Sequence, residues 1–384
     1  MTLRPASNNL VVLAVGVFTV GTDLFVLNGL LPTIARDLHV SESTAGQLTT
    51  VFAATYAVAS PLIAAFTGSW DRRLLLGGGM AVFVVGMVGQ AVGTTFLALA
   101  AARVVAAVGA AAFQANAFAV AGATASDETR GRALSWVATG VSVSSVLGVP
   151  IGVFASASLG WRGVMWGISG VGVLVAAAVL TLPKVLVPAA GLRTRLSVLV
   201  RPAVARVLVV TVFGLTALFA VFVYLPVLAA DVAPGVTIAW VLAAYGLGSV
   251  VGNQLAGRWT DRFGPRRVRL VSIVGCVVLL AVLDGALLRL PGLLVAVVAV
   301  GAFGGMLMVP QQHRLFTLAP DAPTVALGLN GSAIYVGSGL GSALGGLALS
   351  SAGPTWLAPI AAVVAVGALV VALENAPVRE PAMA

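Results

Sequence analysis

Long apolar runs separated by short polar segments make up most of the chain. A helix of about 20 apolar residues is long enough to cross the hydrocarbon core of a bilayer. Runs of this kind lie at 10–31, 45–67, 74–94, 97–122, 131–156 and 162–182, and again at 203–228, 238–257, 268–288, 292–312, 324–350 and 355–373. The pattern predicts an all-α polytopic membrane protein with twelve transmembrane helices.

A polar segment divides these runs into two sets of six. We expect an N-terminal six-helix bundle over residues 1–183, a cytoplasmic linker over 184–202 and a C-terminal six-helix bundle over 203–384. The two sets are alike. Asp71 lies just after the second run, and Asp261 lies just after the eighth run, 190 residues further on. The fifth run aligns with the eleventh at a shift of 193 residues. Similar offsets near half the chain length indicate a duplicated unit whose copies can rock about a shared interface.

Composition agrees with lipid as the main solvent, since 60% of residues are hydrophobic, 9% are charged and the mean hydropathy is +1.08. The net charge of +9 does not indicate nucleic-acid binding, because the basic residues lie in short loops and at helix ends without interleaved aromatics. If both termini are cytoplasmic, only Arg36, Arg162 and Arg289 fall in outer segments. The positive-inside rule therefore predicts a multi-pass protein of the bacterial cytoplasmic (inner) membrane with both termini inside.

One acid lies deep in the first run. Asp23 is flanked by segments without any other charge, and an ionised carboxylate at such depth costs roughly 2.5–3.5 kcal/mol. Arg103, in the fourth run, is expected at a similar depth. Two interpretations stay open: a static buried ion pair, which contributes little once desolvation is counted, or a proton-coupling site whose protonation changes as the surrounding helices move.

Other polar and aromatic residues within the runs are candidates for the lining of a central cavity. Each polar residue on its own is equally compatible with an interhelical hydrogen bond. Gln114 and Asn116 are two apart and do not share a helix face, so at most one is expected to face the cavity. The candidates are Asn28, Tyr56, Gln114, Asn116, Asn253, Asn330 and Tyr335, with Phe25, Phe113 and Phe222 as aromatic walls.

The fifth run has a distinctive set of small residues and one proline, Gly140, Gly148, Pro150 and Gly152. Glycines allow close approach of neighbouring helices, and Pro150 removes a backbone donor and bends the helix. Ordinary glycine-rich membrane packing is the alternative to a functional role for this motif.

Two similar loops follow the second and eighth runs. Positive-inside anchoring explains their arginines but not the acid at each helix end, so we also expect a role in cytoplasmic gating. The first loop has Asp71, Arg72 and Arg73; the second has Gly257, Asp261, Arg262, Gly264, Arg266 and Arg267.

These motifs resemble the major facilitator superfamily. The second loop is similar to the family's two-three loop signature, whereas the first copy is shortened and lacks the second glycine. The run around Asp23, the stretch from Arg103 to Gly109, and Gly148-Val-Pro150-Ile-Gly152 look like the twelve-span drug:proton antiporters, especially the chloramphenicol-exporter and sugar-efflux branch. The resemblance implies a major-facilitator fold of two pseudo-symmetric six-helix bundles, and a span-five motif associated with export direction and with closing a leak.

No phosphate-binding loop and no His or Cys pair at metal spacing is present, so we expect no cofactor and no metal, with a proton gradient as the energy source. The favoured function is secondary active export of a small amphipathic drug or metabolite in exchange for protons, of the multidrug or phenicol type. A sugar or sugar-conjugate efflux transporter is the alternative, and a membrane-embedded enzyme a remote one. The expected partners are a small-molecule substrate, protons and the lipid bilayer, with the chain as a monomer.

Overall fold

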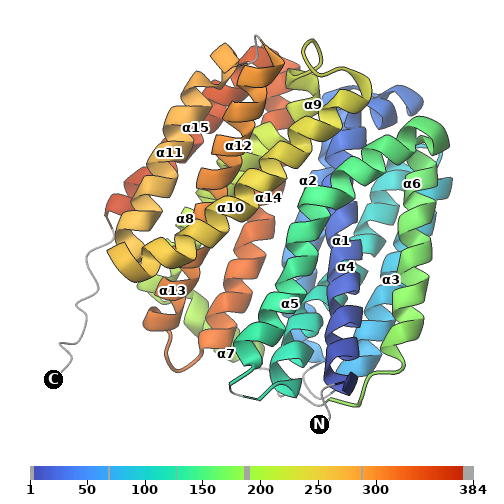
Figure 1. Ribbon diagram of the computed structural model, residues 1–384, viewed down its shortest axis with the longest axis vertical. Coiled ribbons are helices and arrows are strands. Elements are labelled where there is room, and N and C mark those ends of the chain that lie inside the picture. Colours follow the sequence, from blue (N-terminus) through green and yellow to red (C-terminus); the bar gives the residue numbers. More distant parts are fainter. Residues whose placement is uncertain (1–3, 68–69, 127, 186–190, 287–288, 375–384) are drawn as a thin grey trace.

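The computed structural model describes residues 4–67, 70–126, 128–185, 191–286 and 289–374, and no strand occurs among them. The chain forms a bundle of long, roughly aligned helices (Figure 1). The helices are α1 (Arg4–Asp37), α2 (Glu42–Phe66), α3 (Arg72–Val92), α4 (Phe96–Thr124), α5 (Arg130–Val143), the π-helical turn η1 (Ser144–Gly148), α6 (Val149–Val179), α7 (Leu192–Leu199), α8 (Pro202–Phe222), α9 (Leu225–Leu228), the 3-10 turn η2 (Gly235–Thr237), α10 (Ile238–Phe263), α11 (Pro265–Ala286), α12 (Leu290–Met306), α13 (Met308–Leu318), α14 (Pro323–Ala352), the 3-10 turn η3 (Pro354–Trp356) and α15 (Leu357–Leu373).

Ten helical segments of the described residues are long and apolar enough to cross a membrane. One of them, Arg132–Val179, has 48 residues and contains Gly160 with φ 68° and ψ 167°, a backbone conformation that is essentially limited to glycine. The chain therefore bends at Gly160, and this segment holds both the fifth and the sixth predicted spans. Helix α11 covers the ninth, whose residues 287–288 lie outside the described part. The predicted all-α polytopic architecture is confirmed.

The helix boundaries differ from the sequence prediction at three places. The predicted span 203–228 ends early, at Phe222, and the short α9 follows with Pro226 in its first turn. The predicted span 292–312 breaks at Leu307, and α13 begins with Pro310 in its first turn. Because proline has no N–H to donate to the carbonyl four residues before it, both breaks follow from the sequence. Helix α7 lies within the segment expected as a linker.

The helices pack in two groups. In the first, α3 packs on α4 and α6, α2 on α4, and α1 on α5 and α6; in the second, α8 packs on α14 and α15, α10 on α12, and α11 on α12 and α15. The groups meet where α2 contacts α14 and where α10 contacts η1 and α6. In terms of the sequence repeat, the second run contacts the eleventh and the eighth contacts the fifth, so the two contacts of the interface are related to each other by the repeat.

The two groups are joined on one side of the molecule, which we call the closed side: the side where α1 ends at Asp37 and α2 begins at Glu42. There Ser43 Oγ donates to the Gly346 carbonyl at 2.6 Å, and Ser342 Oγ donates to the Gly46 carbonyl at 2.8 Å. The two groups converge at this upper end in Figure 1. Small residues allow α2 and α14 to approach closely enough for hydroxyl-to-backbone bonds.

Candidate functional site

A buried ion pair lies between α1 and α4. Arg103 Nη1 donates to both carboxylate oxygens of Asp23, at 2.8 Å each. Both side chains are 0% exposed. The structure thus brings together the two charged residues that stood out within the apolar runs, and each supplies the other's principal countercharge.

The surroundings of the pair come from two further helices. Arg103 Nε donates to the Leu48 carbonyl of α2 at 3.4 Å, and the guanidinium carbon lies 4.3 Å from the centre of the Phe52 ring. The amide of Gln90, from α3, lies beside the Asp23 carboxylate. Among the described atoms, Arg103 Nη2 has no hydrogen-bond partner. Besides Asp23, the contacts that hold the guanidinium are therefore one backbone carbonyl and one cation–π contact.

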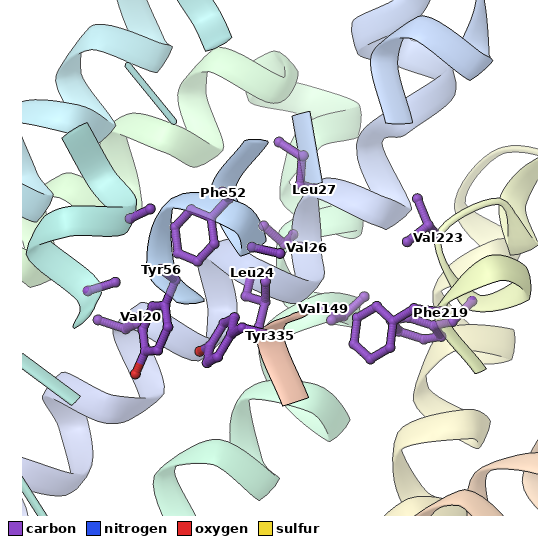
Figure 2. Packing of buried hydrophobic residues seen from close by; sticks show 14 of the residues in the cluster. Val20, Leu24, Val26, Leu27, Phe52, Tyr56, Val149, Phe219, Val223 and Tyr335 are labelled. Atoms are coloured by element: carbon purple, nitrogen blue, oxygen red, sulfur yellow. The ribbon is translucent and has the colours of Figure 1, made fainter. Parts of the chain in front are cut away.

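An aromatic series leads from this pair to the other group of helices. Phe52 stacks with Tyr56, with ring centres 6.4 Å apart, and Tyr56 stacks with Tyr335 of α14 at 3.5 Å and 19°. Figure 2 shows Phe52, Tyr56 and Tyr335 among the packed residues of the core. Both tyrosine hydroxyls donate to Gln114 Oε1 of α4, from Tyr335 at 3.0 Å and from Tyr56 at 3.4 Å. Three of the predicted cavity residues thus form one cluster that spans the interface.

A second aromatic group also crosses the interface. Phe25 of α1 meets Phe222 of α8 edge to face at 6.1 Å, and Phe222 stacks with Tyr245 of α10 at 4.4 Å. Phe219 lies 5.8 Å from Phe222, also edge to face. The sequence analysis did not single out Tyr245 or Phe219, because an aromatic residue in an apolar run carries no signal that separates the interface from the lipid face.

The remaining cavity candidates lie elsewhere. Asn28 accepts from Thr49 Oγ1 at 3.1 Å, and Asn330 accepts from Thr211 Oγ1 at 2.8 Å. Phe113 is buried within the first group, where it packs over Gly16, and Asn253 is exposed on α10. Asn28 and Asn330 thus tie helices together within one group each.

The glycines of the fifth run face α1. A Cβ at Gly140 would meet the Ala14 carbonyl, at Gly148 it would meet Thr22 Oγ1, and at Gly152 it would meet Val26. Pro150 follows a π-helical turn in which the Val149 N–H donates to the carbonyl of Ser144. Such widened turns relieve the contact between a proline ring and the preceding carbonyls. The motif therefore brings η1 and its flanking helices against the stretch of α1 that contains Asp23.

The first loop motif is bonded within its own group. Asp71 caps α3 by accepting from the Arg73 N–H at 3.0 Å, and it also accepts from the Val185 N–H at 3.3 Å. Arg72 donates to Asn116 Oδ1 at 3.0 Å, and Arg73 donates to the Leu180 carbonyl at 3.2 Å. In this state these residues join α3 to α4 and to the end of the sixth span.

The second loop motif is exposed. Asp261 and Arg262 lie in the last turn of α10, and Gly264, which follows the helix, has φ 82°. Asp261 has no ion pair within the described part of the chain. Gly257 lies within α10, while Arg266 and Arg267 are exposed at the start of α11. The sequence analysis did not single out Arg269, which is buried and donates to the Ala372 carbonyl near the end of α15 at 2.9 Å. The sequence did contain a signal for this residue, because Arg269 lies near the start of the apolar run 268–288.

Two groups of membrane-spanning helices that are joined on one side, with a buried ion pair inside the first group, are the architecture of a polytopic membrane transporter. The family model of the Major Facilitator Superfamily matches residues 13–234 and 207–383. The chain belongs to this superfamily. It is a transporter rather than an enzyme, and the resemblance deduced from its motifs is confirmed.

Similar proteins are found in several bacteria. The chain is 34% identical over 371 residues to a "Chloramphenicol resistance protein" of Streptomyces lividans, which covers 93% of this chain and 94% of the relative. It is 30% identical over 349 residues to the "Inner membrane transport protein YdhP" of Escherichia coli strain K12, covering 89% of each. It is also 30% identical over 374 residues to the "Uncharacterized MFS-type transporter YtbD" of Bacillus subtilis, covering 94% of this chain and 93% of the relative.

Proposed function

We propose that the chain is a proton-coupled antiporter that exports a small amphipathic compound of the phenicol type. The observation that carries this proposal is the ion pair of Asp23 and Arg103, which is 0% exposed inside the helix bundle. An ionisable residue at membrane depth is costly and is commonly part of an ion or proton pathway. The similarity to a protein named for chloramphenicol resistance supports the substrate class.

Protonation of Asp23 changes how Arg103 is held. While Asp23 is a carboxylate, both of its oxygens accept from Arg103 Nη1. A proton on one oxygen neutralises the acid. The other oxygen can still accept from Arg103, but the buried guanidinium loses its countercharge and keeps only the Leu48 carbonyl and the Phe52 ring beside the neutral acid. Removing one partner of a buried ion pair typically costs about 3–5 kcal/mol. A difference of this size is sufficient to move a two-state equilibrium between open and closed forms.

Helix α1 provides a physical connection from Asp23 to the interface. Thr22 precedes Asp23 and packs against Gly148 of η1, and η1 in turn contacts α10 of the second group. A shift of α1 on protonation therefore acts directly on an element that holds the two groups together. Binding of a proton can change the conformation only if the protonated site makes different contacts in the open and closed states, and the contact of α1 with η1 provides such a difference.

The proton gradient is the proposed energy source, with no cofactor. Movement of one charge across the membrane supplies about 2.3 kcal/mol per 100 mV. We propose a monomer in the bacterial cytoplasmic membrane, with the closed side facing outward and both termini inside. Single cysteines at Ser41 and Arg193, both exposed, test this orientation in a Cys276→Ala background. A membrane-impermeant maleimide should label Ser41→Cys in intact cells and Arg193→Cys only after lysis; the reverse would refute the orientation.

Transport in reconstituted vesicles tests the coupling. An imposed pH gradient should drive accumulation of labelled chloramphenicol by the unmodified protein, and Asp23→Asn should abolish this accumulation because an amide cannot exchange a proton. Asp231→Asn, which replaces an exposed acid in the loop before α10, is the matched control and should transport normally. Accumulation by Asp23→Asn with an unchanged pH dependence would place the proton site elsewhere.

A further inference from the structure

The stacked tyrosines join α2 to α14 at a deeper level than the serine bonds of the closed side. Tyr56 lies about 14 residues from the start of α2, and Asp23 about 14 residues from the end of α1, so both lie ~21 Å from the closed side at 1.5 Å per residue. Towards the closed side, α2 and α14 are joined by the bonds of Ser43 and Ser342 to backbone carbonyls. The tyrosine pair thus occupies the same depth as the ion pair, at the inner end of the closed contact.

The two tyrosine rings are stacked face to face across the interface between the two groups of helices. The rings are nearly parallel and lie 3.5 Å apart. Both hydroxyls converge on one acceptor, Gln114 Oε1, and the bond from Tyr56, at 3.4 Å, is the longer of the two. Phe52, which stacks with Tyr56 and lies under the Arg103 guanidinium, connects the tyrosine pair to the ion pair. The interface therefore has, at one place, a flat apolar surface, a shared hydrogen-bond acceptor and a connection to the ion pair. In the proposed transport cycle, the two groups of helices have to separate at this place.

We propose that Tyr56 and Tyr335 form the aromatic recognition element of the substrate site, an inference that rests on the proposed export function. An aromatic ring of the exported compound inserts between the two rings and stacks on both. A hydroxyl or amide N–H of the same compound donates to Gln114 Oε1 in place of the longer bond from Tyr56. The preferred substrates are thus flat aromatic amphipaths with a hydrogen-bond donor near the ring.

Insertion also has a mechanical consequence. An aromatic ring is about as thick as the present separation of the two tyrosines, so a bound ring roughly doubles the distance between them. Because Tyr56 is on α2 and Tyr335 on α14, the ligand separates these helices at the inner end of the contact that closes one side. Two stacking contacts replace one, and a stacked aromatic pair is more favourable than its buried area alone accounts for. Binding of an aromatic ligand therefore favours separation of the two groups.

A matched pair of ligands tests the proposal on the purified full-length protein in lipid nanodiscs. Chloramphenicol contains an aromatic ring and hydrogen-bond donors, and an analogue with a cyclohexyl ring in place of the nitrophenyl ring keeps the donors without the flat surface. Equilibrium binding of both is measured by calorimetry. The unmodified protein should bind chloramphenicol about three- to tenfold more tightly than the analogue, as expected for one such aromatic contact.

Two substitutions of Tyr335 separate the ring from the hydroxyl. Tyr335→Leu should remove the preference by weakening chloramphenicol binding while leaving the analogue within about twofold, whereas Tyr335→Phe should retain the preference. Phe213→Leu, which removes an aromatic ring that packs beside Gly367 on the far side of α8, is the control and should bind as the unmodified protein does. Retention of the preference in Tyr335→Leu would overturn the proposal, as would equal binding of both ligands by the unmodified protein. If the unmodified protein binds neither ligand, the phenicol-type function itself is refuted and the proposal with it.

Discussion

Arg72 donates a hydrogen bond of 3.0 Å to the side-chain carbonyl of Asn116, which joins the first residue of α3 to the inner part of α4. The Asn116 amide in turn donates to the Ala112 carbonyl at 2.7 Å. Arg72 is 3% exposed although it lies in a loop motif rich in basic residues. Asn116, considered in the sequence as a cavity residue, is thus the buried acceptor for a residue of the first loop motif.

Replacement of Asn116 should therefore destabilise the first group of helices. Asn116→Leu removes the acceptor and leaves a buried guanidinium donor with one partner fewer, which typically costs about 1–3 kcal/mol. The thermal midpoint of the purified protein in detergent should fall by several degrees. Asn253→Leu changes an exposed amide and should leave the midpoint nearly unchanged. An unchanged midpoint in Asn116→Leu would show that the bond does not stabilise the folded protein.

The contact of Gly148 with Thr22 leads to a second prediction. A Cβ at Gly148 would overlap Thr22 Oγ1, next to Asp23, so Gly148→Ala should displace α1 at the proposed proton site. We expect normal membrane insertion but at least tenfold slower pH-driven transport. Gly170→Ala, at a position with open space, is the matched control.

A double substitution identifies the cause of this loss. Thr22→Ala removes the overlapping hydroxyl, so the Thr22→Ala, Gly148→Ala protein should regain a substantial part of the transport lost in Gly148→Ala. Such recovery is the non-additivity expected of residues in direct contact. Simple addition of the two single effects would exclude the overlap as the cause.

The ion pair between Arg201 and Asp321 predicts a pH-dependent contribution to stability. These residues precede α8 and α14, and hydrogen bonds from Arg201 lower the pKa of Asp321 to about 2. Its ordinary value is about 3.9. Because the pKa is lower in the folded state, the contribution is fully present above about pH 4 and is lost as the pH falls toward 2.

Thermal unfolding at two pH values checks this expectation. Asp321→Asn should lower the midpoint slightly at pH 7 and by a smaller amount at pH 3. High salt should also reduce the effect at pH 7, since the pair is exposed to solvent. Asp231→Asn, in a different loop, controls for the general loss of an acid. An effect of Asp321→Asn that grows as the pH falls would contradict the assignment.

The sequence revealed the ion pair because charge is rare in these runs, and each half of the pair is conspicuous by itself. It also revealed the duplicated architecture, since length and hydropathy largely decide where a helix spans a bilayer. The cluster of Tyr56, Gln114 and Tyr335 was not predictable as a cluster. Its members come from both halves of the chain, and their meeting depends on helix rotation and on which side of the interface is closed.

Local chemistry explains the other differences. The prolines at positions 226 and 310 carried the signal for the breaks after α8 and α12, but apolar residues on both sides of each break made a continuous span the natural reading. The partner of Arg72 was not predictable, because the spacing between a loop arginine and an asparagine in another helix contains no periodic signal. Packing between helices decides such contacts, and hydropathy is insensitive to it.

The closed contact between α2 and α14 can be trapped by a disulfide. A Cβ at Gly339 would lie 3.2 Å from the Cβ of Ala53, close to the usual Cβ separation of about 3.5–4.5 Å in disulfides. Cysteines at both positions, in a Cys276→Ala background, should therefore cross-link under mild oxidation. With a protease site inserted between Lys184 and Gly191, the cleaved halves should stay together on a non-reducing gel and separate after reduction.

Cross-linking should also stop transport, because the proposed cycle requires α2 and α14 to separate on the side where they are now joined. Oxidised vesicles should lose pH-driven accumulation of chloramphenicol and regain it with a reductant. The pair Ala53→Cys and Gly331→Cys is the control: Gly331 lies eight residues from Gly339, about 12 Å along α14, so these cysteines should not cross-link and oxidation should not affect transport. Full transport by the cross-linked protein would mean that the closed contact does not open during the cycle, and the alternating movement proposed for these two helices would have to be abandoned.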